Sequence, residues 1–401
     1  MLEKIQKKPP MQVNRVENEL LLCCATAYSD LAKVDRIRAL VQNQIEWSYV
    51  LRMARKHGLV PLLYQNLKET QLDGIPEHIV DTVRDQFRTI TIRNLTLTAQ
   101  MLRLADLFQQ NGIPAIPYKG PTLGLMAYGD VCLRQFSDLD FLIHRQQVIR
   151  VKELLLTEGY EPEYHLRPAE ESIYLGNECE YNFYSANKRI LVELHWDIVQ
   201  RYFSCNLDVE EFWNHLKPVS LLGREVMTFS PEHLLLILCV HGGGKHQWEM
   251  LGWISDVAQL VKTNKTMNLE WVMEMAFRSG IERMVLLGLY LAWNLLSADL
   301  PTFITERIKK DKVLKFLAKR VHTNIFNEVE GSPGEFERIA FYLKQRERVR
   351  DKVRYCVRRL FTSTEKDWSL LRFPAPLFPF YRFLRPFRLV RKYGRQALGL
   401  G

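Results

Sequence analysis

Two aspartates stand one residue apart in an apolar stretch near the middle of the chain. Residues 137–143, Ser-Asp-Leu-Asp-Phe-Leu-Ile, have the composition of a β-strand, in which successive side chains point to opposite faces. Asp138 and Asp140 therefore share one face, while Leu139 points to the other. Two carboxylates this close repel each other, and burying them without compensation is costly. Mg²⁺ prefers carboxylate oxygens, so the spacing predicts a metal site.

A third acid lies in a second apolar strand downstream. Glu193 stands in the middle of residues 190–196 and shares its face with His195. Two-metal sites for phosphate chemistry usually need a further carboxylate. We therefore expect Asp138, Asp140 and Glu193 to bind Mg²⁺ and to carry the catalysis. The alternative for the glutamate is an ion pair with a neighbouring arginine on a half-exposed strand.

Residues upstream of the acids have the chemistry of a phosphate-binding turn. Lys119 and Gly120 follow a short predicted strand, and Pro121 opens a predicted helix. Glycine lets a ligand approach the backbone, helix amides point at an anion, and the lysine adds positive charge. Arg134 is either a second phosphate ligand or a structural ion-pair partner. Ser137, immediately before the first aspartate, completes the predicted nucleotide-binding set.

The combined motifs resemble the DNA polymerase beta-type nucleotidyltransferase superfamily. Within it, the chain resembles a bacterial family of uncharacterised nucleotidyltransferases often found near polysaccharide-biosynthesis genes. The resemblance rests on Lys119-Gly120, Arg134, the segment 137–143 and the Glu-Leu-His-Trp segment 193–196. Residues 47–67 and 241–261 resemble helical segments that flank the family's core. The resemblance spans residues 40 to 265.

The resemblance implies that an NTP donates its nucleoside monophosphate to an acceptor and that pyrophosphate is released. It gives the three acids the metal-binding roles and gives Lys119 and Gly120 the triphosphate. It also places four polar residues beside the active site, where they would line the acceptor or base pocket: His241, Lys245, His246 and Asp256. The chain departs from the superfamily at the phosphate turn, where Lys-Gly-Pro replaces the usual Gly-Ser or Gly-Gly. The second hypothesis is therefore a nucleotide-binding scaffold or regulator in surface-polysaccharide biosynthesis, without turnover.

Residues 239–246, Cys-Val-His-Gly-Gly-Gly-Lys-His, suggest two other sites. A Walker A loop is excluded because His246 stands where serine or threonine should follow the lysine. A zinc site is disfavoured because we expect the glycines to break the helix, so that His241 and His246 share no assured face. A histidine with a purely structural role is commoner than a zinc ligand.

The apolar periodicity predicts an α+β protein, mostly helical, with a small mixed α/β unit between two helical regions. The resemblance implies that this unit is a mixed-sheet nucleotidyltransferase core. Residues 1–110 are predicted to be helical, and a long helix ends at Asn111-Gly112. Residues 111–228 form the core, with strands near 113–119 and 137–143 and a hairpin that turns at Ser185 to Lys188. Residues 229–365 are helical from an N-cap at Ser230, and residues 366–401 form a basic aromatic tail.

The bulk composition limits the class of protein. The chain has 401 residues, of which 47% are hydrophobic and 25% charged, and its net charge is +9. These values are typical of a folded protein with two or three domains and suit an acidic partner. Nucleic acid is disfavoured because no recognition module is present. The seven cysteines contain no CxxC pair, and the N-terminus has no apolar signal core, so we expect a cytoplasmic protein.

The C-terminal tail leaves two interpretations open. Phenylalanines and arginines could bind an anionic membrane surface or a protein partner, which would make the protein membrane-peripheral. Alternatively, the segment wraps around the helical domain. Four prolines, at 374, 376, 379 and 386, argue against one continuous amphipathic helix.

Overall fold

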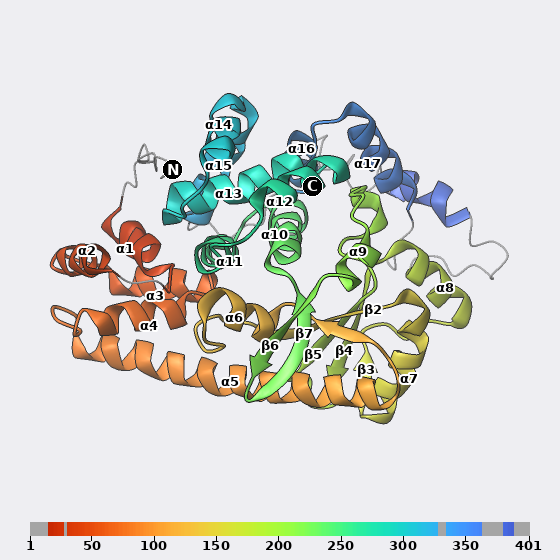
Figure 1. The fold of residues 1–401 in the computed structure, drawn as a ribbon, viewed down its shortest axis with the longest axis horizontal. Helices are drawn as coiled ribbons and strands as arrows, with labels where there is room; N and C mark the ends of the chain where they lie inside the picture. The colour runs from red at the N-terminus through yellow and green to blue at the C-terminus, as the bar shows by residue number, and fades with distance from the viewer. Residues whose placement is uncertain (1–14, 28–29, 328–333, 363–379, 389–401) are drawn as a thin grey trace.

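The computed structural model describes residues 15–27, 30–327, 334–362 and 380–388. Within these residues a five-stranded sheet and a two-stranded sheet lie among many helices (Figure 1). This arrangement confirms the predicted α+β class with a mixed sheet in a mostly helical protein. Most of the predicted tail, residues 366–379 and 389–401, lies outside the described residues.

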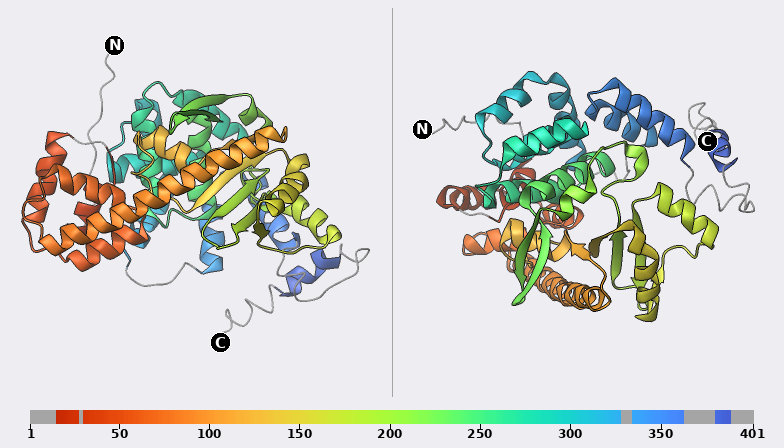
Figure 2. Two further views of the ribbon diagram at one scale, coloured as in Figure 1. Left: turned by 90° about the horizontal axis from the view of Figure 1, so that it is seen from below. Right: turned by 45° about the vertical axis from the view of Figure 1, so that its right-hand side comes forward.

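The N-terminal helices are joined to the sheet by one long helix. Four short helices come first: α1 (Val16–Cys24), α2 (Leu31–Val41), α3 (Trp47–Lys56) and α4 (Val60–Glu69). Helix α5 (Glu77–Gln110) has 34 residues and runs from this cluster to the sheet (Figure 2). Its C-terminal half buries Leu97, Met101 and Phe108 in the core beneath the sheet. It ends at Asn111 with Gly112 at φ +64°, which confirms the predicted end of the helix.

The larger sheet brings the predicted acidic strands together. Its order is β1-β2-β5-β4-β3, with strands β1 (Ala115–Pro117), β2 (Asp138–Ile143), β3 (Tyr160–Pro162), β4 (Glu180–Ser185) and β5 (Leu191–His195). Strands β2 and β5 are parallel, and the register sets Asp140 directly beside Glu193. Strands β4 and β5 form the predicted hairpin, and their register sets Glu180 beside His195.

The two faces of this sheet have different environments, as the alternation in the sequence predicts. Leu139, Phe141 and Val192 point to one face and belong to the same buried cluster as α5 and α7 (Val148–Thr157). The acids point to the opposite face. Three further helices lie between the strands in sequence: α6 (Gly120–Tyr128), α8 (Pro168–Asn177) and α9 (Val209–Trp213).

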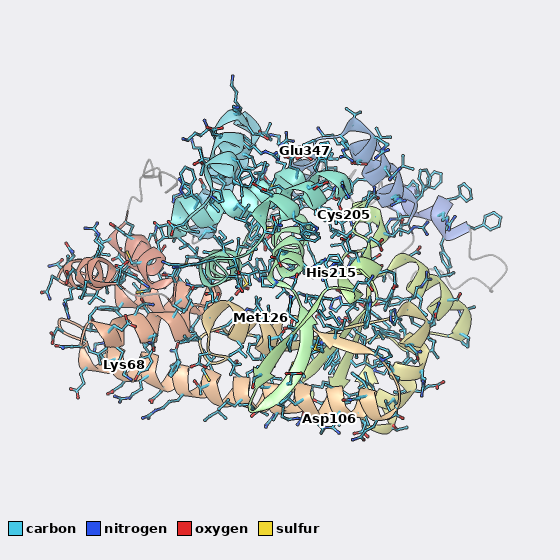
Figure 3. The ribbon with its side chains drawn as sticks, viewed as in Figure 1. Lys68, Asp106, Met126, Cys205, His215 and Glu347 are labelled. Carbon is cyan, nitrogen blue, oxygen red and sulfur yellow. The ribbon has the colours of Figure 1, made fainter. Side chains whose placement is uncertain are left out.

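The second sheet is a hairpin of β6 (Leu216–Leu221) and β7 (Arg224–Phe229), which the sequence did not predict. It covers the edge of the larger sheet, where the Thr228 hydroxyl donates a hydrogen bond of 2.6 Å to the Pro117 carbonyl of β1. At the other end of the hairpin, Arg224 forms an ion pair with Asp106 on α5 (Asp106 is labelled in Figure 3). These contacts fix the hairpin to the core.

The C-terminal half is helical, as predicted. Its helices are α10 (Pro231–Val240), α11 (Leu251–Thr263), α12 (Leu269–Ser279), α13 (Glu282–Leu296), α14 (Thr302–Lys310), α15 (Lys312–Ile325), α16 (Glu335–Gln345) and α17 (Val349–Phe361). Helix α10 begins at the predicted cap, where the Ser230 side chain accepts a hydrogen bond from the backbone of His233. In the described residues no helix is long and apolar enough to cross a membrane.

The glycines after α10 do not break the helix, so that expectation was wrong. Residues His241–Lys245 continue α10 as a π-helical turn. The reason is close packing against Trp248, which is fully buried: a Cβ atom on Gly242 would lie 2.6 Å from Cζ3 of its ring. Glycine is needed at this position for close approach, and the wide turn accommodates the indole.

Two buried clusters divide the interior of the molecule. One cluster contains the sheet face described above, together with α5 and α7. The other contains α1 to α4 together with α10, α11 and α13, so the N-terminal and C-terminal helices share one core. The predicted domain boundaries stay predictions. Helix α17, which precedes the predicted tail, exposes Val349, Val353 and Val357. The predicted contact of the tail with a membrane or a partner also stays a prediction.

Candidate active site

The paired aspartates lie on the face of β2 that points toward the helical half of the molecule. Asp140 is only 3% exposed, and its Oδ1 accepts a hydrogen bond of 2.7 Å from Lys119 and lies 3.1 Å from Nε2 of His195. Its Oδ2 is buried and has no hydrogen-bond partner among the described residues. Burial opposes ionisation, but the charges of Lys119 and His195 hold the pKa of Asp140 well below its usual value. The carboxylate is therefore ionised.

Asp138 lies in a different environment from Asp140. It is partly buried at the first position of β2. Burial, followed by the negative charges of Asp140 and Glu193, raises the pKa of Asp138 to about 6. The two acids of the motif therefore hold protons with different strength, as expected for like charges that share one site.

His195 connects the acids of the two strands, although the sequence analysis assigned it no role. Its Nε2 lies 3.3 Å from Oε2 of Glu193, and its Nδ1 lies 3.6 Å from Oε2 of Glu180. Burial disfavours the imidazolium, but hydrogen bonds to Asp140 and Glu193 raise the pKa of His195 to about 9. The ring is therefore a buried cation between three carboxylates.

Glu180 is the second residue that the sequence analysis missed. Its carboxylate accepts hydrogen bonds of 2.9 and 3.0 Å from Lys245, which the sequence analysis placed in the acceptor pocket. Burial opposes its charge, but His195 and Lys245 lower the pKa of Glu180. The sequence did contain a signal for Glu180. It alternates with Asn182 in the first strand of the hairpin, and Asn182 lies opposite Glu193. Four acids thus lie on one face of β2, β5 and β4, and we call them the acidic row: Asp138, Asp140, Glu193 and Glu180. The cations Lys119, His195 and Lys245 lie among them.

The predicted phosphate turn lies directly against the acids. Lys119 is the N-cap of α6, and Gly120 has φ +49°, a conformation that favours glycine. A Cβ atom on Gly120 would lie 3.4 Å from the Asp138 carbonyl oxygen. Pro121 has no N–H, and the N–H of Thr122 donates to the Lys119 carbonyl, so the ammonium of Lys119 is the main positive group here. Ser137 is exposed immediately before β2.

Arg134 and Asp256 bind each other. The guanidinium donates from Nε and Nη2 to the two carboxylate oxygens at 2.9 and 3.0 Å, and Tyr128 donates to the same carboxylate at 2.8 Å. Burial opposes the charge, but Asp256 raises the pKa of Arg134. This contact agrees with the ion-pair interpretation of Arg134. It also places Asp256 with Arg134 rather than with Lys245.

His241 and His246 lie next to each other beside the acidic row. Their ring centroids are 4.5 Å apart, and Trp253 packs against both rings. Burial and the nearby charge of Lys119 lower the pKa of His241 well below its usual value. Burial and the charge of Lys245 lower the pKa of His246 to about 3. Both imidazoles are therefore neutral, and Lys245 carries the charge of this segment.

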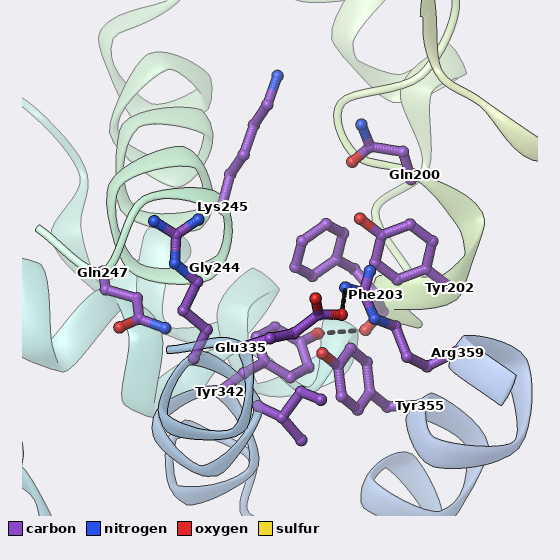
Figure 4. Close-up of a pocket in the computed structure, with 12 residues that line it drawn as sticks. Gln200, Tyr202, Phe203, Gly244, Lys245, Gln247, Glu335, Tyr342, Tyr355 and Arg359 are labelled. Atoms are coloured by element: carbon purple, nitrogen blue, oxygen red, sulfur yellow. Dashed lines mark hydrogen bonds and ion pairs between the residues drawn. The ribbon is translucent and has the colours of Figure 1, made fainter. Parts of the chain in front are cut away.

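A cavity of about 330 Å³ opens beside Lys245 (Figure 4). It is lined by four segments: the turn after β5, the π-helical turn after α10, α16 and α17. The lining residues are Gln200, Tyr202, Phe203, Gly244, Lys245, Gln247, Glu335, Arg338, Ile339, Tyr342, Tyr355 and Arg359. In Figure 4 the ammonium of Lys245 points away from the rings of Tyr342 and Tyr355. Lys245 thus connects the cavity to Glu180 and the acidic row.

Three groups of side chains in the described residues have ligand atoms within 4.8 Å of one another. Two share the row described above: Asp140, Glu193 and His195, and Cys179, Glu180 and His195. The third, Glu211, His215 and His233, lies between α9 and α10 (His215 is labelled in Figure 3). The two carboxylates of the first group fit a divalent cation, because Oδ2 of Asp140 is buried without a partner among the described residues and lies on the same face as Glu193. The protonated His195 has no lone pair for the metal and compensates the acids instead.

The family profile of the uncharacterised nucleotidyltransferases matches residues 43–297. The matched range is more than half of the chain and extends beyond the predicted resemblance, to the end of α13. It includes the acidic row and the phosphate turn, whereas α16 and α17 lie outside it. A comparison with curated proteins found no match. Because the match covers most of the chain, this protein belongs to the uncharacterised nucleotidyltransferase family.

Proposed function

We propose that the protein is a metal-dependent nucleotidyltransferase of the polymerase beta type, which moves a nucleoside monophosphate from an NTP to an acceptor hydroxyl. The observation that carries the proposal is the β2–β5 register, which sets Asp140 beside Glu193. Asp138 shares their face, and Lys119 lies 2.7 Å from Asp140. The family supports nucleotidyl transfer from an NTP. The arrangement of acids supports the proposed dependence on metal.

In this proposal Asp138, Asp140 and Glu193 would hold Mg²⁺, which would neutralise charge on the polyphosphate when bound. Lys119 holds the leaving phosphates at the start of α6, where Gly120 lets them approach the backbone. The acceptor oxygen forms a bond to the α-phosphorus. The bond from that phosphorus to the bridging oxygen breaks, and pyrophosphate leaves with the electron pair. The Glu193 carboxylate accepts the proton of the acceptor hydroxyl. His195, whose Nε2 lies 3.3 Å from Glu193, orients this carboxylate.

One observation favours the second candidate, a nucleotide-binding scaffold without turnover. Lys119 and His195 both contact Oδ1 of Asp140, so the protein's own cations already compensate this acid. A scaffold would bind NTP at Lys119 and would release no pyrophosphate. Pyrophosphate release therefore distinguishes the two candidates.

The test is NTP binding and turnover with the four NTPs, each with Mg²⁺ and with EDTA. Turnover is measured with sugars, simple alcohols and nucleosides added as hydroxyl acceptors. For the wild type we expect one NTP to raise the stability by about 2.7 kcal/mol at 100 times its Kd, only with Mg²⁺. The double variant Asp138→Asn/Asp140→Asn should lose this stabilisation. Its pyrophosphate release should fall by about 10²–10⁴-fold.

The matched control is Asp73→Asn, which removes one exposed carboxylate far from the sheet in sequence and should change neither quantity. Circular dichroism should confirm that all variants are folded. Full pyrophosphate release by the double variant would refute the proposed mechanism. Binding without release in the wild type, whichever hydroxyl acceptor is added, would support the scaffold.

A further inference from the structure

We infer that the cavity beside Lys245 binds the acceptor and that the acceptor is a neutral, polyhydroxylated molecule of the sugar class. The inference rests on the proposed nucleotidyl transfer and deepens it, because it names where the acceptor binds and what chemistry it has. Three features support it: the position of the cavity relative to the phosphate turn, the charge balance of its wall, and its polar and aromatic lining.

The position of the cavity suits an incoming hydroxyl. Lys119 follows β1 at one end of the acidic row, Asp140 and Glu193 lie on the adjacent strands β2 and β5, and Glu180 lies on β4 beyond them. Lys245 binds Glu180 and lines the cavity. In phosphoryl transfer the attacking and leaving oxygens are in line with the phosphorus. A donor whose pyrophosphate is held at Lys119 is therefore attacked from the β4 side, where the cavity opens.

The charge of the cavity wall is balanced. Each of its three cations lies within ion-pair distance of an acid: Lys245–Glu180 at 2.9 Å, Arg359–Glu335 at 2.8 Å and Arg338–Glu249 at 3.4 Å. A phosphate or carboxylate on the ligand would have to break one of these pairs or add a charge without compensation. The described wall therefore favours a neutral ligand.

The polar groups of the wall suit hydroxyls. The side-chain oxygens of Gln200 and Gln247 are buried and have no hydrogen-bond partner among the described residues, and Gln247 is only 5% exposed. Figure 4 shows them on opposite sides of the cavity, with the rings of Tyr202 and Tyr355 on the side of Gln200. Amide oxygens accept hydrogen bonds from hydroxyls, and ring faces pack against the C–H groups of a sugar.

Part of this wall lies outside the matched family range. Residues 335–359, on α16 and α17, lie outside the matched family range of 43–297, whereas Lys245 and Gln200 lie inside it. The family core thus provides the row of acids, and helices beyond it complete the cavity. Acceptor choice is expected to depend on these added helices.

The test measures Mg²⁺-dependent pyrophosphate release with the NTP that binds best and with matched probes. The probes are the methyl glycosides of glucose, galactose and N-acetylglucosamine, and the 6-phosphates of the same sugars. We expect at least one neutral glycoside to accelerate release and its 6-phosphate to be at least tenfold less effective. The variant Gln200→Met should raise KM for the glycoside about tenfold and leave KM for the NTP unchanged.

A charge variant tests the class of acceptor independently. Glu335→Gln removes the partner of Arg359, so it should reduce the preference for the neutral glycoside over its 6-phosphate. Gln109→Met, an exposed site on α5, is the matched control and should change neither KM.

The other outcomes separate this inference from the proposed function. If Gln200→Met raises KM for the NTP instead, the cavity holds the donor's base and the acceptor inference is wrong. If the 6-phosphates are preferred, or if the wild type releases pyrophosphate with other hydroxyl acceptors but with none of the glycosides, the neutral sugar class is wrong. If the wild type binds no NTP, the proposed function fails first.

Discussion

Individual side chains show how a buried strand can carry two acids. Asp140 is ionised because Lys119 and His195 lie within 3.1 Å of its Oδ1, whereas burial and its neighbours raise the pKa of Asp138 to about 6. Neither residue is a simple surface acid. The compensating cations come from the phosphate turn and from the neighbouring strand, so the two motifs depend on each other.

The ion pair of Arg134 and Asp256 gives a prediction at the residue scale. The side chains are 13% and 3% exposed, so Asp256→Asn leaves a buried guanidinium without its charge partner. We expect the free energy of unfolding to fall by about 3–5 kcal/mol, measured by urea denaturation. Asp106→Asn is the matched control, because its pair with Arg224 is 34% and 50% exposed and should contribute far less to stability. Equal costs would show that the buried pair has no special role.

Secondary-structure elements fix which residues meet. The β2–β5 register sets Asp140 beside Glu193, and a slip of one residue would move all the acids to the apolar face. Helix α10 continues through a π-helical turn and so carries Lys245 to Glu180. The geometry of this turn depends on close contact between glycine and tryptophan.

Gly242→Ala tests the π-helical turn. The added Cβ would lie 2.6 to 2.9 Å from three atoms of the buried Trp248 ring, so the indole must move. We expect a loss of about 1–3 kcal/mol in stability and a shift in tryptophan fluorescence. Gly176→Ala on α8 is the control, because its Cβ would meet only Nη2 of Arg145 at 3.8 Å. It should be neutral or stabilising, since alanine favours a helix by about 0.5–1 kcal/mol. A loss of equal size in both variants would contradict this account.

At the scale of the whole molecule, His57 lies where three distant helices meet. It follows α3, its Nε2 lies 3.0 Å from the Ile325 carbonyl at the end of α15, and its Nδ1 accepts from the backbone of Leu251 at the start of α11. The side chain is fully buried. Burial and the charge of Lys56 lower the pKa of His57 to about 4. The neutral ring therefore joins the N-terminal and C-terminal helices.

This histidine predicts how stability depends on pH. Between pH 6.5 and about 4 the unfolded state binds a proton on His57 and the folded state does not, so stability falls as the pH falls. The contribution of His57 to the free energy of unfolding that is lost over this pH range is about 3 kcal/mol. Urea denaturation at pH 7.5, 6 and 5 should show a shallower pH dependence for His57→Gln than for the wild type. The exposed His78→Gln is the control and should keep the wild-type slope. If His57→Gln keeps that slope too, His57 does not contribute to it.

Some elements could not be predicted because tertiary contacts stabilise them. Strands β6 and β7 are exposed at half of their positions and fully buried at only a few, so their sequence has little alternation of buried and polar residues. They pair where Thr228 binds the edge strand and Arg224 binds α5. The glycines of the π-helical turn were likewise interpreted as a break, because their contact with Trp248 is not visible in the sequence around them.

The sequence alone determined the features that depend on neighbouring residues. The strand period set Asp138 and Asp140 on one face, and Ser230 and Asn111-Gly112 set the ends of two helices. Only the tertiary structure decided that Glu180 and His195 join the acids, that Arg134 binds Asp256, and that α16 and α17 close the cavity. The physical reason is that side-chain direction and capping are local properties of the backbone. Strand register, ion pairs and cavities arise where segments far apart in the chain pack together.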